Sequence, residues 1–581
     1  MKFSILVFIT LLVLLSFDSS KVFASSGLVL KPIKLNQLGY KPSDTKVAIV
    51  PAGLADDNTL DVAAGFEIID VSNRSVVFKG KLSRSKLWPY SNENVQQADF
   101  SALQQIGDFV LSIEGVGESY IFEISDDPLY ALHKAAIKSY YFNRSAIDID
   151  SQTGGIYARK AGHHDTKVKV HASAATAERP EGTVLSLPRG WYDAGDYGKY
   201  VVNSGISTYT LLTAYQHFTD LYQNLDLGIV ESGDTAPDLL DEIKWNLDWF
   251  EKMQDIDGGV YHKLTALRFS DMNVSPENET FQRYVIGKSV TASLNYAAIM
   301  AVSSRVFKEL EELFPGVSER YKGKALRAYQ WARSNPNALY AQPSDVGTGA
   351  YDDDNANDEF AWAEAELYLL TGDRYYFEQF LSRKTDPLNN LSWPQVDALG
   401  YISLSTSAHA YLNEREYSQI NDALVAASDA YFLMYENSAY NVAASEPDFV
   451  WGSNGDVLNN GMVLMQGYRI TGEARYREAA MSTVDYVLGK NATGYSFVTG
   501  FGDKSPVNIH HRPSEADQVD VPVPGFLVGG PHAGKQDGCE YTGTLPATTY
   551  ADSVCSYSTN EIAINWNAPL VYMLGAAIDT R

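Results

Sequence analysis

From residue 128 onward, apolar residues recur with the spacing of amphipathic helices, and this periodicity most constrains the fold. In the segment 237–254, one helix face is marked by Leu239, Leu240, Ile243, Leu247 and Phe250. Similar spacing predicts further helices at about 129–143, 200–222, 288–312, 318–334, 358–371, 374–383, 400–413, 417–437, 457–471, 474–489 and 562–579. About twelve helices in one domain of about 450 residues predict a toroid of helical hairpins rather than a small bundle.

The residues before this region consist of short β-rich runs separated by turn residues. The runs cover 47–50, 66–71, 76–82, 109–113 and 120–124, and several of them alternate apolar with polar residues. Such spacing is typical of a β-sandwich of about 100 residues. The sequence therefore predicts a sandwich over residues 25–126 and a helical domain over residues 127–581.

The first 24 residues have the pattern of a secretory signal peptide. Lys2 precedes the apolar run 5–15, and Val22 and Ala24 occupy the −3 and −1 positions of a cut after Ala24. The apolar run is shorter than a membrane-spanning helix requires. We therefore expect the protein to be secreted or periplasmic, without a membrane anchor.

The net charge limits the possible partners. The formal charge is −26, and removal of residues 1–24, which carry a net +1, leaves about −27. Such a surface repels phosphate polyanions, which disfavours nucleic acid and anionic membranes as partners. We therefore expect the ligand to be neutral or cationic.

The chain has two cysteines, Cys539 and Cys555. In an oxidising compartment an isolated pair is more often a disulfide than a metal site. The alternative adds His532 as a ligand and makes a zinc site, although two sulfurs and one imidazole are an incomplete structural set.

Two long connections, 144–199 and 490–561, are candidates for function because loops of this length are rarely passive. The first ends in GWYDAGDYGKY, residues 190–200, which places Asp193 and Asp196 three residues apart just before a helix. In a turn that enters a helix, this spacing can direct both carboxylates at one water molecule. The alternative is that one aspartate only caps the helix.

The segment 550–567, YADSVCSYSTNEIAINWN, places Glu561 at the start of the last helix. Ser558 and Glu561 have the spacing of a capping box, so structure alone could explain the glutamate. The two interpretations differ in the pKa of Glu561. A capping glutamate has a low pKa near the helix dipole, whereas a general acid needs a pKa raised by burial among rings such as Tyr557 and Trp566.

A third candidate is the loop 496–514, SFVTGFGDKSPVNIHHRPS. His510, His511 and Arg512 are consecutive in a segment rich in Gly and Pro. In such an irregular segment, these side chains suit hydrogen bonding to sugar hydroxyls or to a carboxylate better than core packing.

Together, these three segments resemble glycoside hydrolase family 9, the cellulase family with an (α/α)6 barrel, over about residues 130–579. The sequence Asn36-Gln37-Leu38-Gly39-Tyr40 also resembles the immunoglobulin-like domain that precedes this barrel in one branch of the family. The fold class implied is mainly α, an (α/α)6 barrel preceded by a small immunoglobulin-like β-sandwich.

The resemblance implies a role for each matching residue. Asp196 would be the general base, Asp193 its partner in holding the nucleophilic water, and Glu561 the general acid. His510 and Arg512 would line the site, and Asp552 would support it. Weaker candidates for substrate contact are Trp451, His262 and Tyr557.

The segment 351–362, YDDDNANDEFAW, is similar to a stretch that supplies calcium ligands in the family. This similarity implicates Asp358 and Glu359, with Asp397 as a further ligand. Carboxylate oxygens suit Ca²⁺, which takes six to eight of them. The alternative is a solvated acidic loop that precedes a helix.

The function implied is inverting hydrolysis of β-1,4-glucosidic bonds by a secreted endoglucanase. One alternative keeps the fold but acts from a chain end, as a cellobiohydrolase, β-glucosidase or exo-β-glucosaminidase. Another is a non-catalytic glycan-binding relative, which the presence of all three carboxyl groups disfavours. The natural substrate and the oligomeric state stay open.

Overall fold

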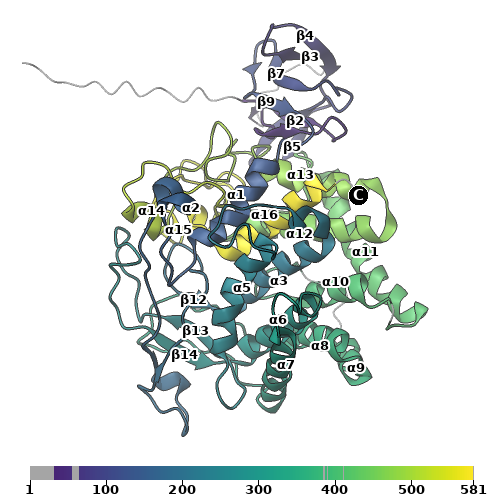
Figure 1. The fold of residues 1–581 in the computed structure, drawn as a ribbon. Helices are drawn as coiled ribbons and strands as arrows, with labels where there is room; N and C mark the ends of the chain where they lie inside the picture. The colour runs from purple at the N-terminus through teal and green to yellow at the C-terminus, as the bar shows by residue number, and fades with distance from the viewer. Residues whose placement is uncertain (1–31, 55–64, 384–386, 389, 410, 580–581) are drawn as a thin grey trace, which may run out of the picture.

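The computed structural model describes residues 32–54, 65–383, 387–388, 390–409 and 411–579. The proposed signal peptide lies outside these residues. In the described chain an N-terminal β-sandwich is followed by a helical domain, and Figure 1 shows the sandwich as a separate lobe beside α1 and α13.

The sandwich consists of two sheets. One has the order β1-β9-β7-β3-β4, with β8 added to β7, and the other has the order β2-β6-β5. The strands are β1 (Gly39–Tyr40), β2 (Val47–Leu54), β3 (Gly65–Asp70), β4 (Val76–Lys81), β5 (Lys86–Trp88), β6 (Glu93–Asp99), β7 (Gly107–Ile113), β8 (Gly117–Glu118) and β9 (Phe122–Ile124). The expected runs match β2, β3, β4, β7 and β9. The sequence did not predict β6, whose alternation is interrupted by buried Gln96.

Twelve helices of the described chain form two layers, an (α/α)6 barrel. The inner helices are α3 (Val201–His217), α6 (Val290–Lys308), α8 (Asn357–Thr371), α10 (Asp397–Ser407), α12 (Ser453–Thr471) and α16 (Ile564–Ile578). The outer helices are α1 (Tyr130–Phe142), α5 (Asp238–Phe250), α7 (Val317–Ser334), α9 (Arg374–Arg383), α11 (Glu414–Asn437) and α13 (Ala474–Val487). Each predicted helix overlaps one of these, and the largest mismatches are at the C-terminal ends of α10 and α3, which the prediction placed at residues 413 and 222.

The inner helices pack against one another, α3 on α6 and α16, and α8 on α6 and α10. They are buried on most sides, and α6, whose residues are apolar or small on nearly every side, is buried from Val290 to Ser304. A helix that is apolar all round has to be surrounded by other elements. The outer helices α7 and α11 instead carry one apolar stripe and face solvent on the other side.

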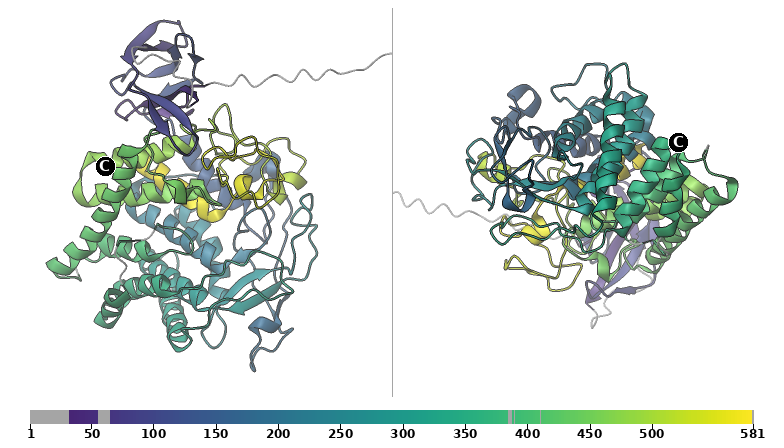
Figure 2. Two further views of the ribbon diagram at one scale, coloured as in Figure 1. Left: turned by 180° about the vertical axis from the view of Figure 1, so that it is seen from behind. Right: turned by 90° about the horizontal axis from the view of Figure 1, so that it is seen from below.

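The long connections are ordered and gather on one side of the barrel (Figures 1 and 2). A five-stranded sheet lies there, with the order β11-β10-β14-β13-β12. Its strands are β10 (Val168–Val170), β11 (Val184–Leu185), β12 (Lys199–Tyr200), β13 (Tyr261–Thr265) and β14 (Tyr284–Lys288). Short helices complete the connections: α2 (Ser151–Gly154), α4 (Thr219–Gln223), α14 (Arg512–Ala516) and α15 (Tyr557–Asn560), with the 3₁₀ turns Gly155–Tyr157, Ala172–Ala174, Glu251–Met253 and Glu446–Asp448.

The sandwich is docked on the helical domain. Val47, Ile49, Trp88 and Val95 belong to the same apolar core as the barrel helices. The ring of Trp88 lies 5.3 Å from that of Tyr440. Burial of large apolar side chains across this boundary stabilises the contact by about 2 kcal/mol for each side chain.

Candidate active site

Asp193 and Asp196 lie in the turn that leads into β12, and both side chains are buried. Neither carboxylate caps α3, because the N-cap residue of this helix is Tyr200 and its side chain makes no capping bond. The capping interpretation is therefore wrong for both aspartates. The backbone of the turn is held from the other end of the chain, since the amide of Ile564 donates to the carbonyl of Asp193.

Asp193 accepts hydrogen bonds from two side chains. Asn203 on α3 donates to Oδ1, and the hydroxyl of Tyr351 donates to Oδ2 over 2.6 Å. Burial, followed by repulsion from Asp196, raises the pKa of Asp193 to about 7. Both bonds fix the orientation of this carboxyl group.

Asp196 has a different set of donors. Its Oδ2 accepts from the amide of Gly198 over 2.9 Å and from the hydroxyl of Tyr200 over 3.1 Å. Hydrogen bonds of this kind stabilise the ionised form of a carboxylate. The two aspartates therefore have different surroundings although they are three residues apart.

Glu561 lies before the last helix and does not cap it. Helix α16 begins at Ile564, with Ala563 as its N-cap residue. Ser558 instead bonds to Asp537. The capping-box interpretation of Glu561 is therefore wrong.

The side chain of Glu561 reaches the turn that carries the two aspartates. Its Oε1 accepts from the amide of Gly195 over 3.1 Å. Burial, followed by repulsion from Asp196, holds the pKa of Glu561 well above its usual value. This direction is the one that a general acid needs and a helix cap lacks.

His510 and Arg512 connect the third motif to the same turn. Arg512 donates through one Nη to the carbonyl of Gly195 over 2.8 Å, and its Nε donates to the carbonyl of Ser270. Nδ1 of His510 donates to the carbonyl of Val554 over 2.7 Å, and burial lowers the pKa of His510. An imidazole and a guanidinium therefore border the carboxyl groups.

The three motifs surround one cavity of about 750 Å³. It is lined by the three carboxyl groups with His510 and Arg512, and by Tyr351, Trp393, Trp451, Asp456, Asn459, Tyr557 and Trp566, among other residues. The rings of Trp451 and Tyr557 lie 5.3 Å apart on its wall. A cavity of this size, with polar groups converging among aromatic rings, is typical of a ligand site.

Several of these residues were not predicted from the sequence. Tyr351 lies inside the segment that was considered only for calcium, and Tyr200 lies inside the aspartate motif. Trp393 lies in a loop without periodicity, and the side chain of Asp456 enters the cavity from the first turn of α12. Only the aromatic content of the motifs hinted at Tyr200 and Tyr351.

His262 and Asp552 do not line the cavity. His262 is fully buried on β13, where Nε2 pairs with the carbonyl of Ala350 and Nδ1 with the hydroxyl of Ser289. Asp552 accepts from the amides of Val507 and Asn508 and does not line the cavity. The prediction for His262 is therefore wrong, and Asp552 supports the loop that leads to His510.

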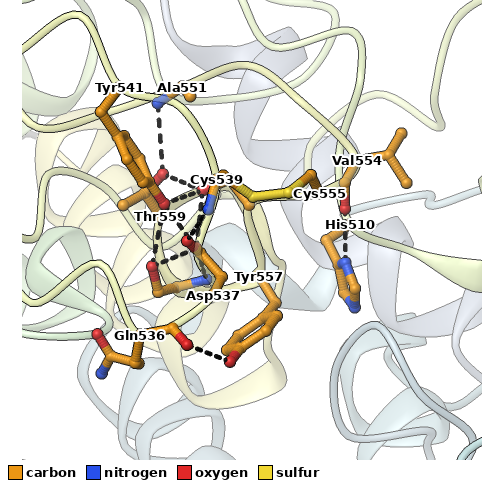
Figure 3. The surroundings of a disulfide bond; sticks show 12 residues. His510, Gln536, Asp537, Cys539, Tyr541, Ala551, Val554, Cys555, Tyr557 and Thr559 are labelled. Atoms are coloured by element: carbon orange, nitrogen blue, oxygen red, sulfur yellow. Dashed lines mark hydrogen bonds between the residues drawn. A yellow bond between two sulfur atoms is a disulfide. The ribbon is translucent and has the colours of Figure 1, made fainter.

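Cys539 and Cys555 form a disulfide, so the zinc alternative is wrong. His532, its proposed third ligand, instead pairs with the carbonyl of Phe449 and the side chain of Gln536. Figure 3 shows that the disulfide joins the loop of Asp537 to the segment of Val554 and Tyr557. The hydroxyl of Tyr557 donates to the carbonyl of Gln536.

The predicted calcium ligands lie away from this cavity. Burial raises the pKa of Asp358 to about 6 and, with repulsion from Asp358, that of Glu359 well above its usual value. Asp358 Oδ1 and Glu359 Oε2 are buried and have no hydrogen-bond partner among the residues that the structure describes. Asp358 Oδ2 accepts from the amide of Val396, which brings Asp397 near.

Those two buried oxygens fit a cation, but the carboxylates alone do not complete a site. Among the described residues, His, Cys, Asp and Glu side chains form no group of three or more that could hold a metal ion. Backbone carbonyls would have to supply further ligands to calcium.

The described part of the chain contains no helix that is both long and apolar enough to cross a membrane.

Comparisons with known proteins agree with this geometry. The chain is 41% identical to a xyloglucan-specific endo-beta-1,4-glucanase of Bacteroides ovatus, over 94% of this chain and 93% of the relative. It is 30% identical to endoglucanase D of Acetivibrio thermocellus, over 94% of this chain and 83% of the relative. A solved structure described as Bacteroides ovatus GH9 superposes with a TM-score of 0.87 at 40% identity, covering 94% of this chain and 99% of that one.

Two family models match consecutive parts of the chain. The model of the cellulase N-terminal ig-like domain matches residues 30–118, and that of glycosyl hydrolase family 9 matches residues 130–574. The expected family, fold and enzyme class are confirmed. The chain belongs to glycosyl hydrolase family 9 and carries the immunoglobulin-like domain of cellulases in front of its (α/α)6 barrel.

Proposed function

We propose that this protein is an endo-β-1,4-glucanase that cleaves its substrate with inversion at the anomeric carbon. The observation that carries the proposal is the meeting of Glu561 with the turn of Asp193 and Asp196 in one aromatic-lined cavity. Inverting hydrolysis needs two carboxyl groups in opposite protonation states at one glycosidic bond. The raised pKa of Glu561 favours the protonated form that the acid role needs.

In the proposed reaction Glu561 is the general acid. Its raised pKa favours the protonated carboxyl, which gives its proton to the glycosidic oxygen as the bond to the anomeric carbon breaks. Asp196, held by Gly198 and Tyr200, accepts a proton from the water that attacks this carbon from the opposite side. Asp193 helps to orient that water.

The cavity walls support a glucan as the substrate. Apolar faces of pyranose rings can stack on Trp451 and Tyr557, while His510 and Arg512 offer donors to hydroxyl groups. The relative that is 41% identical is named for xyloglucan, a branched β-1,4-glucan. We therefore propose a β-1,4-glucan backbone, with xyloglucan as the first substrate to test.

The test measures reducing ends and viscosity together on xyloglucan and carboxymethylcellulose, with chitosan oligomers and aryl glucosides for comparison. An endo-acting enzyme lowers the viscosity of a polymer long before many ends are released. Viscosity that falls only in proportion to released ends would show attack from a chain end. Absence of release from every substrate would contradict the proposal.

The stereochemistry is tested by proton NMR early in the hydrolysis of a cello-oligosaccharide. Inversion makes the α-anomer the first product, because water attacks the anomeric carbon directly. A β-anomer that appears first would contradict the inverting mechanism.

We also propose that calcium stabilises the barrel through Asp358 and Glu359, with Asp397 as a further ligand. The support is the pair of buried carboxylate oxygens that have no hydrogen-bond partner in the described part of the chain. A cation bound only in the folded state raises the melting temperature by mass action. Chelation should therefore lower the melting temperature and added Ca²⁺ should restore it. Protein that contains calcium by metal analysis but melts at the same temperature after chelation would contradict this role.

Export is proposed on the basis of residues 1–24 and of the disulfide between Cys539 and Cys555, a bond favoured in oxidising compartments. Sequencing the N-terminus of the native protein tests this proposal. A mature chain that begins after Ala24 would support it, and one that retains the leader would contradict it.

A further inference from the structure

Lys263 on β13 is a buried cation that the proposed reaction does not use. Its ammonium contacts four neutral acceptors in the described chain: Gln342 Oε1 at 3.0 Å, Gly349 O at 2.6 Å, and Thr348 Oγ1 and O at 3.3 and 3.4 Å. Removing an ammonium from water is costly unless other interactions compensate. A buried lysine with only neutral partners therefore needs an explanation.

The backbone that Lys263 holds leads directly to the active site. Lys263 donates to the carbonyls of Thr348 and Gly349, and the neighbouring His262 pairs through Nε2 with the carbonyl of Ala350 over 2.9 Å. Two consecutive residues of β13 thus bind three consecutive carbonyls. The next residue in the chain is Tyr351.

Tyr351 has an unfavourable backbone conformation. Its φ is +51°, in the left-handed region that bulky residues rarely adopt. Such a conformation persists only where the surrounding structure over-determines it. The bonds from His262 and Lys263 immediately before Tyr351 supply that constraint.

This conformation presents the Tyr351 hydroxyl to the carboxyl groups. The hydroxyl donates to Asp193 over 2.6 Å, and its ring lies 4.8 Å from that of Tyr200, which donates to Asp196. Lys263 is directly opposite Tyr200 in the pairing of β12 with β13. Its ammonium lies 5.7 Å from the centroid of the Tyr200 ring.

We propose that Lys263 is a positioning residue for glucan hydrolysis, which fixes the backbone of Thr348 and Gly349 so that Tyr351 keeps its hydroxyl on Asp193. The inference rests on the proposed hydrolytic function. It also gives the sequence GGVYHKL a role other than contact with substrate, because His262 and Lys263 both act on the backbone before Tyr351.

The charge of Lys263 has a second consequence. Burial lowers the pKa of Lys263 to about 7, while attraction to Asp196 and Asp352 opposes that shift. The ammonium therefore adds positive charge on the side of the site that holds Asp196. The other titratable groups around it are His262, whose own pKa burial lowers to about 3, and the phenols of Tyr200 and Tyr340.

The test compares Lys263→Met with Lys288→Met, the same change on the neighbouring strand β14. The ammonium of Lys288 binds Asp255 and Asp257 instead of the backbone before Tyr351. For Lys263→Met we expect kcat on a soluble β-1,4-glucan to fall at least about tenfold with KM changed less than about twofold, because misplaced catalytic groups lose rate rather than binding. Lys288→Met should keep both constants.

Two further readouts separate positioning from a structural role. The pH profile of kcat/KM should change in Lys263→Met, since the variant lacks the ammonium group whose pKa is about 7. In a Tyr351→Phe background the same change should cost less than about threefold, because two residues that act through one contact are not additive. Full additivity, or an unchanged pH profile, would contradict the proposal.

If Lys263→Met does not fold, Gln342→Ala takes its place. Gln342 is half-buried, accepts from Lys263 and donates to the carbonyl of Thr348 over 2.7 Å. We expect kcat to fall about threefold with KM unchanged, and an unchanged kcat would overturn the inference. A wild-type protein inactive on every β-1,4-glucan would contradict the proposed function itself, whereas an active wild type with unaffected variants contradicts only the role of Lys263.

Discussion

The raised pKa of Asp193 predicts that Asp193→Asn stabilises the protein while it removes activity. The folded-state pKa is about 7, against an ordinary value of 3.8. Between these two pH values the folded protein therefore binds more protons than the unfolded chain does. Under this condition the free energy of unfolding falls as pH rises. The loss of stability that Asp193 causes therefore begins near pH 4 and is complete a little above pH 7.

The size of the effect follows from the shift. About three pH units at about 1.4 kcal/mol each give about 4 kcal/mol as the upper value at pH 8. An asparagine has the shape of the aspartate without its charge, and it can still bond to Asn203 and to the hydroxyl of Tyr351. We therefore expect the variant to exceed the wild type by up to about 4 kcal/mol at pH 8 and to match it near pH 4.

The assay is denaturant unfolding of both proteins at several pH values from about 4 to 8. Asp422→Asn, at an exposed position on α11, is the matched control and should change the free energy of unfolding little at any pH. Because Asp193 interacts with Asp196 and Glu561, the shape of the curve belongs to the whole group. A variant no more stable than the wild type at pH 8, or a difference that does not grow with pH, would refute the argument.

Three further predictions concern the acid, the disulfide and the sandwich. Glu561→Gln should lower kcat on a cello-oligosaccharide by about 10²–10⁴ but much less on a dinitrophenyl cellobioside, whose leaving group needs no proton; equal losses would exclude the acid role. Replacing Cys539 and Cys555 by serine should cost up to about 3 kcal/mol in stability, because the bond closes a short loop. The same change should raise KM by loosening the segment of Tyr557, and an unchanged KM would show that the disulfide does not shape the cavity. Residues 127–581 expressed alone should melt at a lower temperature and keep turnover on a short oligosaccharide, since removal of Trp88 uncovers Tyr440. An unchanged melting temperature with lost binding to insoluble cellulose would instead make the sandwich a binding module.

The sequence by itself determined the helical architecture and the principal carboxyl groups. Helical periodicity shows which face of a segment is buried, and this face can be identified without knowing which element packs against it. The predicted helices therefore match the barrel, and the motifs that contain Asp193, Asp196 and Glu561 meet in one cavity. These residues are recognisable because they are close in sequence to turns and loops with unusual composition.

Where two interpretations fit the same local sequence pattern, only the tertiary structure distinguished between them. Glu561 has the spacing of a cap, yet α16 begins three residues later, and burial near Asp196 sets its pKa. The cysteines were compatible with zinc until their sulfur atoms were placed in a bond. Neither outcome is encoded in the spacing of the residues concerned.

The surroundings of the carboxyl groups come from residues far away in the chain. Tyr351 reaches Asp193 across 158 positions, and Lys263 acts on the backbone before Tyr351 from another strand. Periodicity describes one element at a time, whereas hydrogen bonding and desolvation depend on which elements the fold brings together. For this physical reason His262, which the sequence suggested as a sugar contact, is a buried residue that holds the carbonyl of Ala350.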